Sequence, residues 1–402
     1  MPLFADELNQ RLAALREQGL HRELRRVDSA AGPHIEINGK TLLNFSSNDY
    51  LGLANHPALK EAAIKGIEKF GAGAGASRLV CGSLAPFHEL EETLATFKKT
   101  EAALTFSTGY AAALGTITAL AGKDDIIILD KLVHASIVDA VKLSGAKLRV
   151  FGHNDLDDLE DKLKWATSDS RHPSPVTRHI LIVTESIFSM DGDTAPLKEI
   201  VALKEKYGAW LMVDEAHATG IIGQNGRGLA DELGVSSRIE IQMGTLGKAL
   251  GTSGGFICGS RALIDYLVNR ARSFIFSTAP VPAAAAAAIA GIKIAQSAEG
   301  ETRRAQLRQR LGEFRLAISL EQSQSSAFSP IIPLIIGDEA KALNAAAHLR
   351  EQGIFIPAIR YPTVARGTAR LRIAITASHT HTDVEQLVLG LNWPMDFENF
   401  PQ

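Results

Sequence analysis

Short apolar runs alternate with amphipathic stretches along residues 102–260, and this alternation indicates an α/β fold. Continuous runs such as DIIILD at 125–130 and HILIVTES at 179–186 are typical of strands that are buried on both faces. Stretches with helical spacing, such as 111–121 and 134–145, lie between these runs. Because parallel strands need long crossover connections, we predict a mainly parallel sheet with helices on both faces, which is a three-layer α/β domain.

The two ends of the chain show other patterns. Residues 3–26 have the spacing of an amphipathic helix, and HIEINGKTLLNF at 34–45 predicts a hairpin that turns at its Asn-Gly pair. Near the C-terminus, Thr382 and Glu385 have the spacing of a capping box and predict the start of the last helix.

The length of 402 residues exceeds what one hydrophobic core usually supports. Long helical stretches and short apolar runs replace the regular alternation after about residue 280. We therefore expect an N-terminal arm and helix at 1–45, a large α/β domain at 46–285 and a smaller α+β domain at 286–402.

Composition and charge favour a globular protein that acts on small molecules. The formal net charge is −3, from 42 basic and 45 acidic residues, which does not suggest a nucleic-acid or membrane partner. The basic clusters at 21–26 and 303–310 have helical spacing and are typical of solvated helix faces. Cys81 and Cys258 are far apart, so neither a disulfide framework nor a metal site follows from their spacing. The first residues lack a signal-peptide pattern, and the alanine run at 282–295 is too short to cross a bilayer, so we expect a cytoplasmic protein without a metal.

Polar residues that follow the predicted strands carry the candidate chemistry. In open α/β sheets the ligand site lies beyond the carboxyl ends of the strands. A strand-to-helix turn at that edge presents N–H groups and a helix dipole that suit a phosphate. The residues at these positions are Ser107, Thr108, Gly109, His134, Glu185, Ser189, Asp214, His217, Thr245 and Lys248.

Each of these residues also has a purely structural interpretation when it is taken alone. Lys248, in TLGKALG, could be a loop lysine that reaches solvent, or an amine with a lowered pKa that forms a Schiff base. Asp214 could cap a turn, His134 could pack as a core ring and Ser189 could bond within its own turn. Because all of these residues are expected at the same edge of the sheet, a functional site is favoured over separate structural roles. A lysine, a carboxylate and a phosphate-binding turn are what pyridoxal phosphate (PLP) requires.

Several motifs resemble those of the α-oxoamine synthases of PLP fold type I, from about residue 25 to 390. The motifs are NFSSNDYLGLANHP, TESIFSMDGDTAPL, VDEAHATG, GTLGKALGTSGGFICG, FIFSTAP and PTVARGTARLRI. The resemblance implies an aminotransferase-like fold with a large PLP-binding domain and a smaller C-terminal domain.

The resemblance also implies roles for individual residues. Lys248 would hold PLP as a Schiff base and then move the α-proton of the amino acid. Asp214 would pair with the pyridine nitrogen, and His134 would stack on the ring and contact substrate. The remaining cofactor-binding residues would be Gly109, Tyr110, Ser189, His217, Thr245, Ser277 and Thr278.

Two of these residues, Ser277 and Thr278, would reach a phosphate in a neighbouring subunit, which implies a homodimer with shared sites. The implied substrate-binding residues are Arg25, Asn48, His134, Thr363 and Arg372. Either Arg22 or Arg26 could take the place of Arg25. Arginine suits the carboxylate of an amino acid because its planar fork binds both oxygens.

The implied reaction joins an amino acid to an acyl thioester with loss of CO2. IFSTAP and AIRYPTV look more like the motifs of the family member that joins L-alanine to a pimeloyl thioester. Glycine with a shorter acyl group, acetyl or succinyl, remains an alternative. Coenzyme A and an acyl carrier protein both remain open as the thiol.

Other protein classes fit the chain less well. GAGAGA at 71–76 matches a dinucleotide-binding pattern, but a helical stretch precedes it where that pattern needs a strand. GTSGG at 251–255 matches the nucleophile turn of a hydrolase, but the chain then continues as a strand. A regulatory protein on a PLP fold usually loses the lysine or gains a DNA-binding segment, and this chain keeps Lys248.

Overall fold

The computed structural model describes residues 3–168, 179–318, 325–326 and 328–391. Contacts between Cα atoms divide the chain into two compact units. The larger unit comprises Asn48–Ser189 and Asp193–Gln306, and the smaller comprises Met1–Ser47, Met190–Gly192 and Leu307–Gln402.

A seven-stranded sheet forms the centre of the larger unit, in the order β3-β9-β8-β7-β6-β4-β5. Neighbouring strands run parallel except around β9, which is antiparallel to both β3 and β8. The strands are β3 (Ala102–Phe106), β4 (Ile126–Asp130), β5 (Lys147–Phe151), β6 (Ile180–Glu185), β7 (Trp210–Asp214), β8 (Ile241–Thr245) and β9 (Gly255–Gly259). The predicted mainly parallel sheet is therefore confirmed.

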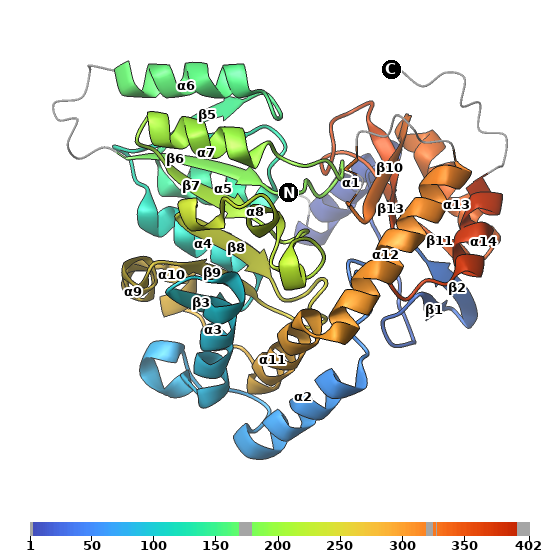
Figure 1. Cartoon of the computed structure of the whole chain (residues 1–402). Coiled ribbons are helices and arrows are strands. Elements are labelled where there is room, and N and C mark those ends of the chain that lie inside the picture. Colours follow the sequence, from blue (N-terminus) through green and yellow to red (C-terminus); the bar gives the residue numbers. More distant parts are fainter. Residues whose placement is uncertain (1–2, 169–178, 319–324, 327, 392–402) are drawn as a thin grey trace. The chain divides into compact units, whose positions relative to one another are not determined.

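Helices cover both faces of this sheet (Figure 1), as predicted. One face packs against α4 (Gly109–Leu120), α5 (Ala135–Ser144), α9 (Arg261–Arg270) and α10 (Arg272–Ile275). The other face contacts α3 (Ala85–Lys98), α6 (Leu156–Ser168) and α7 (Leu197–Lys206). Shorter elements are α8 (Leu229–Glu232), a π-helical turn (Arg78–Gly82) and two 3-10 turns (Gln224–Gly226 and Ser236–Arg238).

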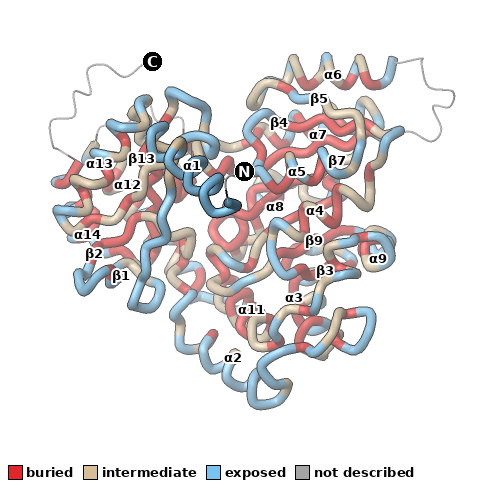
Figure 2. Tube along the Cα trace, turned by 180° about the vertical axis from the view of Figure 1, so that it is seen from behind, coloured by how far each residue is buried: buried red, intermediate tan, exposed pale blue. Residues whose placement is uncertain are grey.

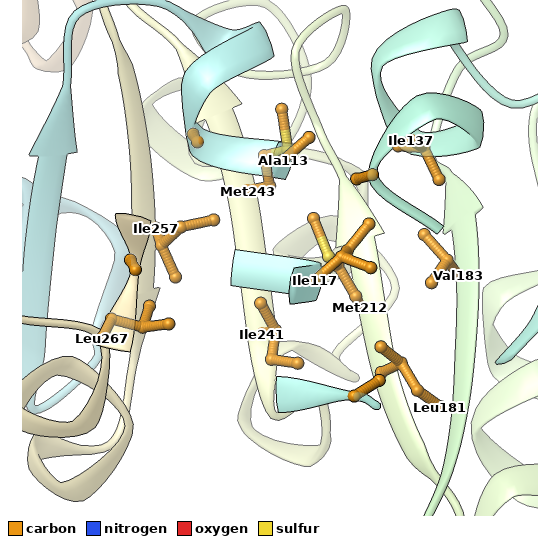
Figure 3. Packing of buried hydrophobic residues seen from close by; sticks show 14 of the residues in the cluster. Ala113, Ile117, Ile137, Leu181, Val183, Met212, Ile241, Met243, Ile257 and Leu267 are labelled. Atoms are coloured by element: carbon orange, nitrogen blue, oxygen red, sulfur yellow. The ribbon is translucent and has the colours of Figure 1, made fainter. Parts of the chain in front are cut away.

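The core beneath α4 and α5 is continuous along the sheet. Figure 3 shows Ile117 and Ile137 projecting from these helices toward Met212, Val183 and Leu181 of the strands. All five side chains are almost fully buried, and Figure 2 shows the same strands as buried. Burial of this kind holds α4 rigidly against the sheet and therefore sets the position of its N-terminus.

Helices α2 (Pro57–Phe70) and α11 (Pro282–Gln296) pack against each other inside the larger unit. A Cβ atom added to Gly66 of α2 would lie 3.1 Å from Ala283 Cα and 3.2 Å from Ala286 Cβ, so the two helices approach closely. The sequence predicts a domain boundary at 285/286, inside the alanine run at 282–295. The contacts place the division after Gln306, because small side chains let α11 pack tightly on α2.

The smaller unit contains two three-stranded sheets, β1-β2-β11 and β10-β13-β12. Their strands are β1 (His34–Ile37), β2 (Lys40–Asn44), β10 (Ile331–Gly337), β11 (Ile354–Phe355), β12 (Ala358–Ile359) and β13 (Ala369–Ala374). Its helices are α1 (Phe4–Glu17), α13 (Glu339–Glu351) and α14 (His381–Leu391), and α12 (Ala298–Ala317) crosses from the larger unit. This mixture confirms the predicted α+β character.

Two local predictions for the N-terminal part of this unit, a hairpin and a helix, had different outcomes. The hairpin is confirmed, because Asn38 and Gly39 both take positive φ, 51° and 71°, between β1 and β2. The helix expected over residues 3–26 ends at Glu17, since the chain turns at Gly19 with φ 66°.

The predicted capping box of the last helix was wrong. Thr380 and Asp383 form it instead of Thr382 and Glu385. Asp383 N donates to Thr380 Oγ1 at 3.1 Å, and Thr380 N donates to Asp383 Oδ2 at 2.7 Å. The helix therefore starts at His381, one residue before Thr382. Across the described part of the chain, no helix is both long and apolar enough to cross a membrane.

Candidate functional site

The carboxyl ends of β6, β7 and β8 align at one edge of the larger sheet. Glu185 pairs with Asp214 across β6 and β7, and Asp214 pairs with Met243 across β7 and β8. The segments that follow these strands carry Ser189, His217 and Lys248. The sheet register thus collects the predicted polar residues of three strands at one edge.

A chain of hydrogen bonds links Lys248 to the loop that precedes α2. Lys248 Nζ lies 2.7 Å from His217 Nε2, and His217 Nδ1 lies 2.7 Å from the Tyr50 hydroxyl. The Tyr50 hydroxyl also donates to Asn48 Oδ1 at 3.0 Å. Tyr50 and His217 are buried, so these bonds form away from bulk water.

The network assigns the proton positions on His217. Because the single hydroxyl proton of Tyr50 goes to Asn48, the Tyr50 oxygen accepts from His217 Nδ1–H. His217 Nε2 of the neutral ring is then the acceptor that faces Lys248. His217 Nε2 therefore helps to fix the direction of the Lys248 amine.

Two buried carboxyl groups lie next to this lysine. Asp214 is 6% exposed and accepts one bond from Ala216 N at 2.8 Å. Burial raises the pKa of Asp214, and the charge on Lys248 opposes that rise. Burial, and after it the Asp214 charge, raise the pKa of Glu185 well above its usual value. A further cation beside Asp214 would keep its carboxylate ionised, and a protonated pyridine nitrogen is such a cation.

His134 sits at the first turn of α5 with its orientation set by two neighbours. Its Nδ1 accepts from Ser136 N at 3.2 Å and lies 2.8 Å from Ser136 Oγ, so the ring proton belongs on Nε2. Its backbone N donates to Glu185 Oε1 at 2.5 Å. Burial lowers the pKa of His134. The Asp214 charge opposes this shift, and the Lys248 charge adds to it. A neutral, fixed imidazole suits stacking on an aromatic ring.

The N-terminus of α4 and Thr245 form a site with the chemistry of a phosphate cradle. Thr245 Oγ1 is buried and has no hydrogen-bond partner among the described residues. A Cβ atom on Gly109 would lie 2.7 Å from Thr245 Cγ2, so Thr245 lies directly against the start of α4. The first N–H groups of a helix lack acceptors within it, and the helix dipole favours an anion there.

These groups fit PLP. Lys248 can bind its aldehyde, Asp214 can pair with its ring nitrogen, and Thr245 with the start of α4 can bind its phosphate. The unsatisfied Thr245 hydroxyl and the buried Asp214 carboxyl are both groups that PLP would complete.

The remaining predicted residues lie in several places. Ser189 is buried after β6, and Tyr110 in the first turn of α4 donates to Asp139 Oδ2 at 2.5 Å. Thr278 pairs with Ser77 in an isolated β-bridge, next to Ser277. Asn48 belongs to the larger unit, and the predicted substrate residues Arg25, Thr363 and Arg372 belong to the smaller unit.

Two functional candidates were missed from the sequence. Tyr50 lies in the NFSSNDYLGLANHP motif, and its position two residues after Asn48 was the available signal. His153 had no such signal, because its partners Asp130 and Asp193 are distant in sequence.

His153 joins two segments that carry site residues. Its Nδ1 lies 2.9 Å from Asp130 Oδ1, and its Nε2 lies 2.7 Å from Asp193 Oδ2. Asp130 also accepts from Leu132 N in the segment that leads to His134. The ring packs edge-on against Phe188, the neighbour of Ser189. His153 therefore stabilises both segments at once.

Comparison with known proteins identifies the family. The family model for aminotransferase class I and II matches residues 40–391. The chain belongs to this family. It is 45% identical, over 94% of its own length and 94% of the relative, to the 8-amino-7-oxononanoate synthase of Thermoanaerobacter pseudethanolicus. The predicted family resemblance and fold class are confirmed.

Solved structures in this family have the same fold. A serine palmitoyltransferase from S. paucimobilis with a bound PLP–myriocin aldimine is 30% identical, with a TM-score of 0.88 over 97% of each chain. The 8-amino-7-oxononanoate synthase of Francisella tularensis is also 30% identical, with a TM-score of 0.73 over 89% of this chain and 99% of that one.

Tyr50→Phe tests the hydrogen-bond chain. The change leaves the buried His217 Nδ1–H without its acceptor, so we expect a stability loss of about 1–3 kcal/mol. Since His217 then no longer holds Lys248 in place, we also expect PLP to bind roughly tenfold more weakly. Calorimetry measures the change in stability, and absorbance titration measures the change in PLP affinity.

Tyr266→Phe, at an exposed position on α9, is the matched control and should change neither quantity. Equal PLP affinity in the Tyr50 variant and the wild type would contradict the role assigned to Tyr50.

His153 makes the stability of the larger unit depend on pH. Burial opposes its charge, but the bonds and charges of Asp130 and Asp193 raise the pKa of His153 to about 10. The unfolded value is near 6.5, so this stabilisation is complete below pH 6.5 and is lost as the pH rises to about 10. We expect the melting temperature of the wild type to exceed that of His153→Gln at pH 7 and to approach it toward pH 10. A His153→Gln difference that stays constant or widens with pH would refute the assignment.

Proposed function

We propose that the protein is a PLP-dependent 8-amino-7-oxononanoate synthase. It would join L-alanine to a pimeloyl thioester and release 8-amino-7-oxononanoate, CO2 and a free thiol, as a step of biotin biosynthesis. The observation that carries the proposal is the Lys248–His217 contact at 2.7 Å, at the edge of the sheet where Asp214 lies. The identity of 45% to relatives of that name, over nearly the whole chain, supports the same reaction.

Bound PLP would supply an electron sink for the charge left on the amino acid when its α-proton or its CO2 departs. Lys248 would hold the cofactor through its Nζ atom and, once displaced by alanine, accept the α-proton at that atom. His217, with Nε2 toward Lys248, would orient this amine during both events. Asp214 would keep a proton on the ring nitrogen, which keeps the sink effective.

Other residues would bind and orient. Thr245 and the first N–H groups of α4 would hold the phosphate, and the neutral His134 ring would limit motion of the cofactor plane. Arg372, almost buried on β13, would bind the carboxylate of alanine through its planar fork. Asn48, Thr363 and Arg25 would contact the acyl substrate.

Sister enzymes of this fold use other substrate pairs. Glycine with acetyl-CoA or succinyl-CoA would need the same cofactor groups. Serine with palmitoyl-CoA would fit the serine palmitoyltransferase neighbours, but their identity to this chain is 30%, against about 45% for the oxononanoate synthases. The higher identity favours alanine and a pimeloyl group.

Thiol release from PLP-loaded protein tests the reaction. We expect release with L-alanine and pimeloyl-CoA or a pimeloyl carrier protein, and little with glycine, with serine or with the shorter acyl groups. Lys248→Ala should lose turnover by at least about a thousandfold, because the group that carries the proton is gone. Lys164→Ala, an exposed lysine on α6, should leave the rate unchanged. Near-normal turnover of Lys248→Ala would refute the mechanism, and release with glycine alone would assign a sister enzyme.

We also propose a homodimer with shared active sites. Around the Ser77–Thr278 bridge, Leu79, Val80 and Phe276 are exposed by 53%, 78% and 70%. Apolar side chains gathered in this way are typical of a surface that another chain covers. A twofold axis beside this patch would carry Ser277 and Thr278 to the phosphate of the partner subunit.

Mixing two inactive variants tests this sharing. One variant is Lys248→Ala and the other combines Ser277→Ala with Thr278→Ala. If Thr278 and Ser277 serve the partner's site, each mixed dimer contains one intact site. We expect the mixture, after subunit exchange, to recover about a quarter of wild-type turnover, since half of the dimers are mixed and half of their sites are intact. No recovery, or a monomer in sedimentation equilibrium, would contradict the shared site.

A further inference from the structure

A buried ion pair lies next to the edge of the sheet where Asp214 emerges. Lys98, in the last turn of α3, donates from Nζ to Glu215 Oε2 and to the backbone carbonyl of Arg227. The Lys98 side chain is 2% exposed and the Glu215 side chain is 0% exposed. A buried ion pair adds little net stability compared with apolar side chains of similar size. Stability alone therefore does not explain why two charges lie here.

The Glu215 carboxylate also holds the loop that follows it. Its Oε1 accepts from Ala230 N at 2.9 Å. A Cβ atom on Gly228 would lie 2.5 Å from both carboxylate oxygens, so only a glycine lets the loop pass this close. Together with the bond from Lys98 to the Arg227 carbonyl, these contacts fix the loop around the buried pair.

Glu215 connects this pair to two residues of the cofactor site. It directly follows Asp214, and its backbone N donates to Met243 O at 2.8 Å. Its backbone carbonyl accepts from Ala218 N at 3.0 Å, which closes a turn that contains His217. A displacement of Glu215 would therefore move Asp214 and His217 together. All of these residues belong to the larger unit.

Several ionisable side chains act on Asp214. Burial raises the pKa of Asp214, Lys248 and His134 lower it, and the Glu215 charge raises it further. Glu185 lies beside Asp214 on β6, and burial together with the Asp214 charge raises the pKa of Glu185. A carboxylate that pairs with a protonated ring nitrogen has to stay ionised. An uncompensated charge on Glu215 would work against that state.

Lys98 offsets the Glu215 charge. An ammonium in contact with a carboxylate cancels most of its effect on a third group, because the two opposite charges lie at nearly the same distance from that group. Lys98 supplies such an ammonium to Glu215. The buried Cys258 thiol is a further titratable group that both charges influence. Burial raises the pKa of Cys258 to about 12, so this thiol stays neutral beside the pair.

We infer that Lys98 is a positioning residue of the cofactor site, which acts through Glu215 on Asp214 and His217. Its ammonium holds the Glu215 turn in place and offsets the Glu215 charge beside Asp214. The inference rests on the proposed function, from which it takes the role of Asp214 toward the ring nitrogen of PLP.

The pH dependence of PLP affinity tests this role, by absorbance titration of the full-length protein with PLP. Binding weakens on acidification when Asp214 takes up a proton, so the pH at which affinity falls reports the ionisation of Asp214. Lys98→Met leaves the Glu215 charge alone, and we expect this pH to rise by about one pH unit. Glu215→Gln keeps an acceptor for Ala230 N but leaves the Lys98 charge alone, and we expect this pH to fall by about as much.

The double variant Lys98→Met/Glu215→Gln removes both charges, so its affinity should fall at about the pH of the wild type. It should also melt at a higher temperature than Lys98→Met, because an unpaired buried charge costs more than no charge. If Lys98→Met does not fold, the comparison of Glu215→Gln with the double variant remains. Glu215→Gln should still retain PLP to a lower pH than the double variant does.

Lys204→Met is the matched control, because Lys204 is another buried lysine that pairs with a glutamate. Lys204 Nζ donates to Glu240 Oε1 at 2.5 Å, and the Lys204 side chain is 7% exposed. Glu240 directly precedes β8, so this pair lies at the opposite end of the strands from Asp214. We expect Lys204→Met to lower the melting temperature and to keep the wild-type pH dependence of PLP affinity.

Opposite shifts in the two single variants would support the inference. A pair with a purely structural role would weaken PLP binding in both variants without moving the pH in opposite directions, and that result would overturn it. PLP binding does not require turnover. If the wild type releases no thiol from any thioester, the proposed reaction therefore fails, while opposite shifts would still support the role of Lys98.

Discussion

The contact between Lys248 Nζ and His217 Nε2 is the interaction on which the site depends. A reactive amine has to point in one direction, but the four rotatable bonds of a lysine side chain allow it many others. Here the buried His217 ring hydrogen-bonds the amine, and the Tyr50 hydroxyl accepts a hydrogen bond from His217 Nδ1. Asn48 Oδ1 in turn accepts a hydrogen bond from the Tyr50 hydroxyl. Tyr50 and His217 each bond on two sides, and both are buried, so the groups that set the direction of Lys248 are themselves held in place.

The sheet supplies the second constraint, which is electrostatic. The register of β6 and β7 sets Glu185 and Asp214 side by side in a buried environment, where neither carboxylate is stable without compensating charge. Lys248 provides part of that charge, and the backbone N–H groups of His134 and Ala216 provide hydrogen bonds. The two buried carboxyl groups therefore favour binding of a further cation beside Asp214, and the protonated ring nitrogen of a cofactor would be such a cation.

Much of the fold could be predicted because it depends on local pattern. The buried runs that became β4 and β6 are continuous in sequence, and Asn38-Gly39 has the backbone freedom that its turn needs. Errors arose where a neighbour distant in sequence decides. Helix α11 joins the larger unit because Gly66 of α2 admits its alanines, and α14 starts at His381 because Asp383 satisfies Thr380. In both cases the sequence shows a compatible residue, but not which partner it will meet.

The sequence by itself determined the alternation of strands and helices, the edge at which Asp214 and Lys248 emerge, and the family to which these motifs belong. These features depend on residue spacing and on which residues follow each strand, and both can be read along the chain. Only the tertiary structure decided that Tyr50 bonds His217 and that His153 joins Asp130 to Asp193. Hydrogen bonds and charge interactions act over a few ångströms, and residues that lie from 23 to 167 positions apart come within that range only when the chain has folded.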